Sequence, residues 1–140
     1  MTIYFAGSIR GGRDDLDIYL SLIEELKKYG EVFTEHIGKE SIADLREELT
    51  SEEIYERDMR WLTGADLVVA EVTQPSLGVG YEVACAEAMG KRILCLHRPL
   101  PGKRVSAMIG GNPTLNVRAY TNLTDAAEIV RAFCTTELVE

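Results

Sequence analysis

Short apolar runs alternate with amphipathic stretches along this chain. The runs with the length and composition of strands cover residues 2–6, 31–34, 66–72, 92–96 and 117–120. Strands that alternate with helices form a mainly parallel sheet covered by helices on both faces. The pattern therefore predicts an α/β fold, a doubly wound five-stranded sheet of the Rossmann or flavodoxin kind, built as a single domain over residues 1–140.

The stretches between the strands repeat apolar side chains at helical spacing. The predicted helices cover residues 14–29 with Gly30 as the stop, 50–64, 80–89 with Gly90 as the stop, and 125–133 with Thr124 as the cap. Thr50 and Glu53 have the spacing of a capping box at the start of the second helix. The polar connection 35–49 reads as a loop with one helical turn, and 97–113 as a surface excursion over a ligand or a partner chain.

Charge and cysteine content narrow the class of protein. Fifteen Lys and Arg against 23 Asp and Glu give a formal net charge of −8, which repels a phosphate backbone. We expect neither polymeric nucleic acid nor a membrane as partner. Cys85, Cys95 and Cys134 are too few and too scattered for a disulfide framework or a zinc site, so we expect reduced thiols, no metal, and a cytoplasmic protein without a secretion leader.

Two loops that follow predicted strands carry candidate phosphate-binding chemistry. Ligands of parallel sheets bind beyond the carboxyl ends of the strands. The loop over residues 7–13 offers glycine backbone, the Ser8 hydroxyl and the guanidinium groups of Arg10 and Arg13, next to a predicted helix start. Amide donors, the helix dipole and arginine together can hold a phosphate. The alternative is a strand-to-helix turn that needs glycine for its conformation alone.

The second loop, residues 76–80, precedes the strongest candidate nucleophile. Glu82 is expected one or two residues inside the helix that this loop opens. A helix start stabilises a carboxylate as the anion, which is the state that a nucleophile requires. The alternative is an acid that only complements the helix dipole.

Three further side chains are candidates for the same cleft. Asp58 shares a helix face with Trp61 and Leu62, so it belongs either to a polar network or to a proton donor site. Tyr4 points away from its strand neighbours and reaches the cleft or fills the core. His36 is equally a ligand contact or an ordinary loop residue. Two acids beside phosphate loops suit cleavage at the anomeric carbon of a nucleotide.

Several strings in this chain carry a family resemblance. They are YFAGSIRGG at 4–12, TEH at 34–36, the segment 58–61, ADLVVAEVTQPSLGVGYE at 65–82, KRILCL at 91–96 and SAMI at 106–109. With these strings the chain resembles the 2'-deoxynucleoside 5'-phosphate N-hydrolase family, which belongs to the nucleoside 2-deoxyribosyltransferase superfamily. The resemblance extends over nearly the whole chain, up to the last predicted helix.

The resemblance implies roles for individual residues. Glu82 matches the nucleophile that forms a covalent deoxyribosyl intermediate, Tyr4 the tyrosine that orients it, and Asp58 the aspartate that assists departure of the base. Ser106 matches a serine that reaches the phosphate from the neighbouring subunit, which implies a homodimer, and His36 a histidine near the base. The substrate-binding set is Gly7, Ser8, Ile9, Arg10, Gly11, Gly12, His36, Ser76, Gly78 and Ser106.

The two lines of reasoning agree on the phosphate group. A transferase of unphosphorylated nucleosides has no use for Arg10 and two amide-rich loops, whereas a dianion left unpaired in a cleft is costly. We therefore expect hydrolysis of 2'-deoxynucleoside 5'-monophosphates to free base and 2-deoxyribose 5-phosphate, without a cofactor. The alternatives are a nucleoside 2-deoxyribosyltransferase and a noncatalytic nucleotide-binding module. The preferred base stays open.

Overall fold

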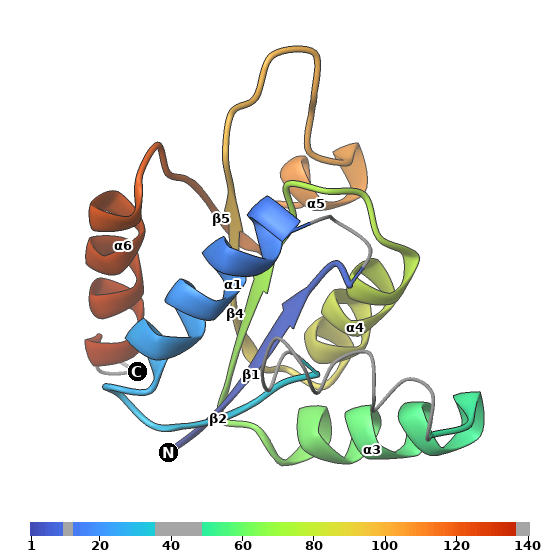
Figure 1. The fold of residues 1–140 in the computed structure, drawn as a ribbon. Coiled ribbons are helices and arrows are strands. Elements are labelled where there is room, and N and C mark those ends of the chain that lie inside the picture. Colours follow the sequence, from blue (N-terminus) through green and yellow to red (C-terminus); the bar gives the residue numbers. More distant parts are fainter. Residues whose placement is uncertain (10–12, 36–48, 137–140) are drawn as a thin grey trace.

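A parallel sheet forms the centre of the computed structural model, which describes residues 1–9, 13–35 and 49–136. Its strands are β1 (Thr2–Gly7), β2 (Glu31–Phe33), β3 (Leu67–Glu71), β4 (Arg92–His97) and β5 (Asn116–Ala119). They lie in the order β2-β1-β3-β4-β5, and each neighbouring pair is parallel (Figure 1). This is the strand order of flavodoxin-like folds, and it confirms the predicted α/β class.

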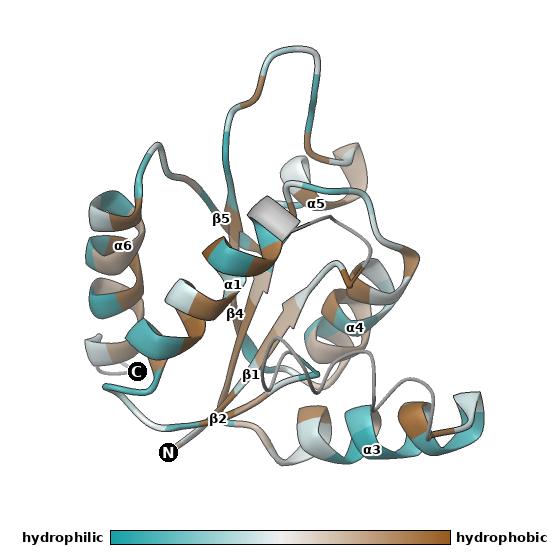
Figure 2. Cartoon of the chain, in the orientation of Figure 1, coloured by the Kyte–Doolittle hydropathy of each residue, from teal (hydrophilic) through white to brown (hydrophobic). Residues whose placement is uncertain are grey.

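Helices cover both faces of this sheet. They are α1 (Arg13–Leu26), α3 (Ser51–Gly64), α4 (Leu77–Ala88), the short α5 (Ala107–Gly110) and α6 (Leu123–Thr135). The helices α1 and α6 pack against each other on one face, and α3 and α4 lie on the other (Figure 1). Figure 2 shows apolar residues along the strands and polar residues on the outer side of α6, as expected for a helix that packs on a sheet.

The alternation of side chains along β1 sorts the core into two halves. Ile3 and Phe5 belong to the cluster under α1 and α6, whereas Tyr4 and Ala6 belong to the cluster under α3 and α4. Every residue of β3 is buried, which confirms the prediction that its continuous apolar run is covered on both faces. Tyr4 therefore points toward α3 and α4, the face on which the candidate acids lie.

Local sequence signals predicted some helix ends correctly. The Thr50 side chain accepts a hydrogen bond from the Glu53 backbone, and the Glu53 side chain accepts one from the Thr50 backbone, so the capping box is confirmed. Gly90 ends α4 with φ 72°, a backbone conformation that favours glycine. These signals are contacts between near neighbours in sequence, which explains why they could be predicted.

Other helix ends differ from the prediction. The helix α1 ends at Leu26 rather than at residue 29, and Gly30 is not its cap. Gly30 is instead required by a close approach, because a Cβ atom there would lie 2.5 Å from the backbone oxygen of Met1. The cap of α6 is Asn122, whose side chain accepts from the Asp125 backbone, so the assignment of Thr124 was wrong.

The largest difference concerns α4. Ser76 caps this helix by accepting a hydrogen bond from the Val79 backbone, and the helix begins at Leu77 instead of at residue 80. Gly78 and Gly80 therefore lie in its first turns and not in a preceding loop. Glu82 is consequently the sixth residue of the helix, well beyond the turn where the helix dipole acts.

Two remaining expectations concern segments rather than single residues. The segment 107–110, part of the expected surface excursion, forms α5. Most of the connection 35–49 falls in 36–48, outside the described residues. None of the helices in the described ranges has both the length and the apolar character that a bilayer span requires.

Candidate active site

A cavity of about 600 Å³ opens at the carboxyl ends of β1 and β3, between α3 and α4. This is the edge of the sheet at which parallel folds bind ligands. Of the predicted site residues, those that line it are Gly7, Ser8, Ile9, Asp58, Ser76, Gly78 and Glu82. The structure thus brings together both candidate acids and the described parts of both predicted phosphate loops.

Tyr4 and Glu82 form a hydrogen-bonded pair beneath this cavity. The Tyr4 hydroxyl, carried by β1, donates to Oε2 of Glu82 on α4. Burial raises the pKa of Tyr4, and the nearby charges of Glu82 and Asp58 raise it further. The phenol therefore stays protonated and remains a donor, so Tyr4 is part of the core and also orients the candidate nucleophile.

The electrostatics of Glu82 differ from the expectation. Burial raises its pKa to about 7; the Tyr4 hydrogen bond opposes this rise and the charge of Asp58 adds to it. The prediction that the helix start keeps this carboxylate ionised was wrong, because Glu82 lies more than a turn inside α4. Its anionic form is stabilised by a phenol from the neighbouring strand instead.

Asp58 is buried on α3 and belongs to a polar network. Arg57 donates from Nε to Asp58 Oδ1 at 3.0 Å, and the Arg57 guanidinium lies 4.7 Å from the centroid of the Trp61 ring. The ring and the carboxylate together hold the guanidinium in place. The structure therefore shows Asp58 in a polar network at the wall of the cavity, a place that is also compatible with the proton-donor interpretation.

Glu35 is a site residue that the sequence reasoning did not select. It directly follows the buried Thr34 after β2, lines the cavity, and hydrogen-bonds to Asp58 through their carboxyl groups. Burial and that hydrogen bond raise its pKa to about 8, while Arg57, with Nη2 3.6 Å from Glu35 Oε1, opposes the rise. With its pKa raised to about 8, Glu35 keeps its proton at neutral pH. Its position after a strand was the signal that could have identified it.

The described parts of the phosphate loops have different constraints. A Cβ atom at Gly7 would lie 3.2 Å from the rings of Phe5 and Tyr19, a tight contact that would force these rings to shift by a few tenths of an ångström. At Gly78 the nearest atom would be Ser76 Oγ at 4.0 Å, which is ordinary contact. The remaining members of the predicted set, Arg10, Gly11, Gly12 and His36, lie outside the described residues.

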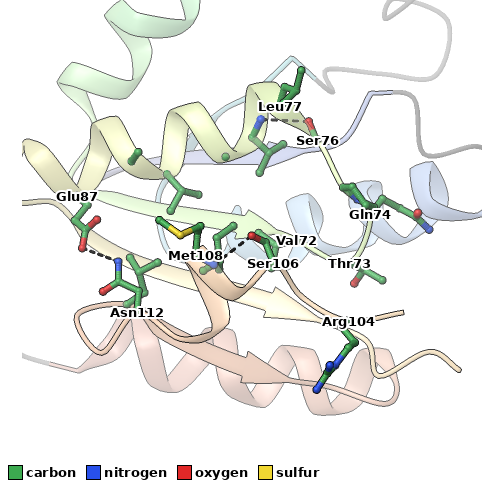
Figure 3. A pocket seen from close by; sticks show the side chains of 17 residues that line it. Val72, Thr73, Gln74, Ser76, Leu77, Glu87, Arg104, Ser106, Met108 and Asn112 are labelled. Carbon is green, nitrogen blue, oxygen red and sulfur yellow. Dashed lines mark hydrogen bonds between the residues drawn. The ribbon is translucent and has the colours of Figure 1, made fainter. Parts of the chain in front are cut away.

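Ser106 lies in a neighbouring cavity of about 700 Å³ between α4 and the segment 104–115. Ser106 and Met108 lie across this cavity from α4 (Figure 3), and the Ser106 hydroxyl accepts from the Met108 backbone at 3.3 Å. The two cavities share Ser76 and Leu77 in their walls. Ser106 is not among the described residues that line the cavity of Glu82 in its own chain.

The groups around the cavity of Glu82 can carry out a defined set of chemical steps. Glu82 offers a carboxylate held by Tyr4, and Asp58 with Glu35 offers an exchangeable proton nearby. A nucleophile beside an acid pair suits substitution at an electrophilic carbon with a poor leaving group. Within the described ranges, no group of three or more His, Cys, Asp or Glu side chains is placed to hold a metal ion.

Comparisons with known proteins agree with this chemistry. A family model described as nucleoside 2-deoxyribosyltransferase matches residues 3–108. A zebrafish (Danio rerio) protein named 5-hydroxymethyl-dUMP N-hydrolase is 53% identical over 124 residues, 86% of this chain and 87% of that protein. A Nematostella vectensis protein with the provisional name 2'-deoxynucleoside 5'-phosphate N-hydrolase 1 is 56% identical over 111 residues, 78% of this chain and 76% of that one.

Solved structures share the fold. The CMP N-glycosidase of Clostridium botulinum superposes with a TM-score of 0.64 at 20% identity, over 95% of this chain and 99% of that one. At this identity the likeness concerns the fold alone.

Proposed function

The chain belongs to the nucleoside 2-deoxyribosyltransferase family, and from this premise we propose that it hydrolyses the N-glycosidic bond of 2'-deoxynucleoside 5'-monophosphates. The products are the free base and 2-deoxyribose 5-phosphate. The single observation that carries this proposal is the Tyr4–Glu82 pair at the same cavity as the Asp58–Glu35 pair. The names of relatives that are 53% and 56% identical support the same activity.

The first step forms a covalent intermediate on Glu82. One carboxylate oxygen bonds to C1' of the sugar while the bond from C1' to the base nitrogen breaks, and the electron pair stays on the base. The base takes up the proton that Glu35 holds in the Asp58–Glu35 pair. Tyr4 fixes the orientation of the Glu82 carboxylate throughout this step.

The second step releases the sugar. A water oxygen bonds to C1' as the ester bond to Glu82 breaks, and the bonding electrons return to the carboxylate. The water gives one proton back to the Asp58–Glu35 pair, which restores the starting state. The same acid pair therefore acts as acid in the first step and as base in the second.

The remaining lining residues of the cavity suit binding of the 5'-phosphate. Ser8 and Ile9 after β1, and Ser76 and Gly78 at the start of α4, line the same cavity as Glu82. We assign these residues, with Gly7, Arg10, Gly11 and Gly12, to the phosphate cradle. Because the whole chain carries a charge of −8, the local donors must overcome an unfavourable overall field.

We further propose that the active unit is a homodimer in which Ser106 serves the partner's phosphate site. Leu77 is 96% exposed and Met108 82% exposed, and both line the mostly apolar cavity that contains Ser106. Large apolar side chains this exposed, gathered at one groove, are typical of a contact surface. Its continuity with the cavity of Glu82, through Ser76 and Leu77, supports a shared site.

Base release from a panel of nucleotides tests the activity. The four common 2'-deoxynucleoside monophosphates, 5-hydroxymethyl-dUMP and the ribonucleotides are incubated with wild-type protein and with Glu82→Gln. We expect base release from deoxynucleotides with the wild type alone. A new nucleotide formed when excess adenine is present would indicate a transferase instead. Nucleotide binding without any base release would indicate a binding module.

We also propose a cytoplasmic location. The three cysteines are free thiols, and burial raises the pKa of Cys95 and of Cys134 to about 11. Such thiols stay protonated near neutral pH and suit a reducing compartment. Cell fractionation with a specific antibody tests this location.

A further inference from the structure

A fully buried glutamate lies on the other face of the sheet from Glu82. Glu71, the last residue of β3, is 0% exposed and belongs to the face covered by α1 and α6, because Val69 two residues before it packs there. Its oxygens accept hydrogen bonds from the Thr73 backbone at 2.7 Å, from the Thr73 hydroxyl at 2.9 Å and from the Tyr120 hydroxyl. The mechanism proposed above makes no use of this carboxylate.

Arg98 joins this glutamate to α1. Its Nη2 bonds to the buried Asp15, its Nε lies 3.6 Å from Glu71 Oε2, and its backbone nitrogen donates to the Thr73 hydroxyl at 2.9 Å. One guanidinium thus compensates two buried carboxylates that come from different elements. We call Asp15, Glu71, Thr73, Arg98 and Tyr120 the rear network.

The rear network holds the chain next to both parts of the predicted phosphate site, the loop after β1 and the start of α4. Asp15 is the third residue of α1, directly after the loop that follows β1. Glu71 pairs in register with Gly7, where that loop begins. Thr73 belongs to the segment between β3 and Ser76, the cap of α4. The network therefore fixes the ends of the loop after β1 relative to the segment that precedes α4.

We infer that Arg98 is a positioning residue that sets the spacing between the loop after β1 and the start of α4 for the 5'-phosphate, an inference that rests on the proposed function. Phosphate binding by several backbone donors requires those donors to converge, and small displacements lose much of the interaction. Arg98 does not line the cavity of Glu82 within the described residues and acts through its contacts with Asp15 and Thr73. Arg98 differs from the phosphate-cradle residues because it supports both the loop after β1 and the start of α4.

Two arginine variants test this inference, one at Arg98, directly after β4, and one at Arg92, the first residue of β4. Arg98→Met removes the link between the loops, and we expect an about 10-fold higher KM for monophosphates with kcat within about two-fold of wild type. The matched control is Arg92→Met at the start of β4. The Arg92 side chain bonds to the Phe133 backbone oxygen at 2.9 Å and lies over the Phe133 ring, far along the strand from the loops. The control should lower the melting temperature and leave KM unchanged.

Two milder variants keep the test valid if Arg98→Met does not fold. Asp15→Asn keeps the shape of the side chain and removes the charge that Arg98 holds, so it should raise KM in the same way. Arg98→Lys keeps the positive charge but cannot span Asp15 and Glu71 together, so it should give an intermediate KM. A folded Asp15→Asn protein with wild-type KM would overturn the inference.

Inorganic phosphate separates this inference from the proposed function. Its binding, followed as protection against thermal unfolding, needs no catalysis. If wild-type protein releases no base but Arg98→Met and Asp15→Asn bind phosphate about 10-fold more weakly than Arg92→Met, the proposed function fails and the inference holds. If wild type is an active hydrolase and all variants bind phosphate equally, the inference alone fails. Absence of phosphate binding by wild type would also overturn it.

Discussion

Two glutamates at the same end of the sheet, the half-buried Glu82 and the fully buried Glu71, have opposite surroundings. Glu82 faces a cavity and receives one hydrogen bond from the described residues, from Tyr4; Glu71 is enclosed and receives three, one of them from Tyr120. In each case a tyrosine hydroxyl donates to the glutamate carboxylate, Tyr4 to Glu82 and Tyr120 to Glu71. The difference is that the lone pairs of Glu71 are satisfied by its own chain, whereas Glu82 faces open space. A carboxylate can act as a nucleophile only where its oxygens are accessible.

Exchanging each glutamate for glutamine should give the largest contrast. Glu82→Gln removes the nucleophile, and we expect kcat to fall by more than about 1,000-fold while nucleotide binding is retained. Glu71→Gln places an amide among three donors, so it should cost about 1–3 kcal/mol of unfolding free energy and raise KM, with kcat within about three-fold. Steady-state base release and denaturant unfolding measure both effects. An active Glu82→Ala protein would remove the nucleophile assignment.

Tyr4 and Tyr120, the tyrosines that bond to Glu82 and Glu71, allow the same comparison with smaller expected effects. Tyr4→Phe removes the donor that orients Glu82 and opposes the rise of its pKa, and we expect kcat to fall about 100-fold with little change in stability. Tyr120→Phe removes a buried hydrogen bond and should lower the unfolding free energy by about 1–2 kcal/mol with kcat unchanged. The same two assays distinguish them. Equal loss of kcat in both variants would mean that the phenols act through stability alone.

The fold and part of the site were predictable because their signals are local. Alternation along β1 placed Tyr4 on the correct face, and a four-residue box placed the start of α3. The start of α4 was wrong because Gly78 and Gly80 suggested a loop, whereas the Ser76 cap and the burial of Val79 and Val83 outweigh a glycine cost of about 1 kcal/mol per residue.

What the sequence did not reveal is long-range pairing. Asp15 and Arg98 are 83 positions apart, and Tyr4 and Glu82 are 78 apart. No spacing rule connects such residues, because their contact depends on the strand order. The pairing of Glu35 with Asp58 was missed for the same reason: the pKa of Glu35 is raised by its burial and by its hydrogen bond to Asp58, and both depend on the tertiary structure.

The pH dependence of the reaction should report this acid pair. The pKa of Glu82 is raised to about 7 and that of Glu35 to about 8. Glu82 must be ionised, so kcat/KM should rise with pH through about 7; the acid pair must hold its proton, so the rate should fall above about 8. Glu35→Gln cannot lose a proton and should abolish the falling limb. A falling limb unchanged in Glu35→Gln would assign that proton elsewhere.

The smallest expected effect comes from Ser106, which we propose completes the cavity of Glu82 from a second copy of the chain. Glu71, in contrast, is covered by its own chain. Ser106→Ala should raise KM about 10-fold, because one phosphate contact is lost. Mixing Ser106→Ala with Glu82→Ala protein and allowing subunits to exchange should then restore wild-type KM at about one quarter of the sites, since each mixed dimer contains one intact site. If both residues served the same chain, every site in the mixture would lack one of them, and no site with wild-type KM would appear. The Ser106→Ala protein alone provides the baseline against which the restored fraction is measured.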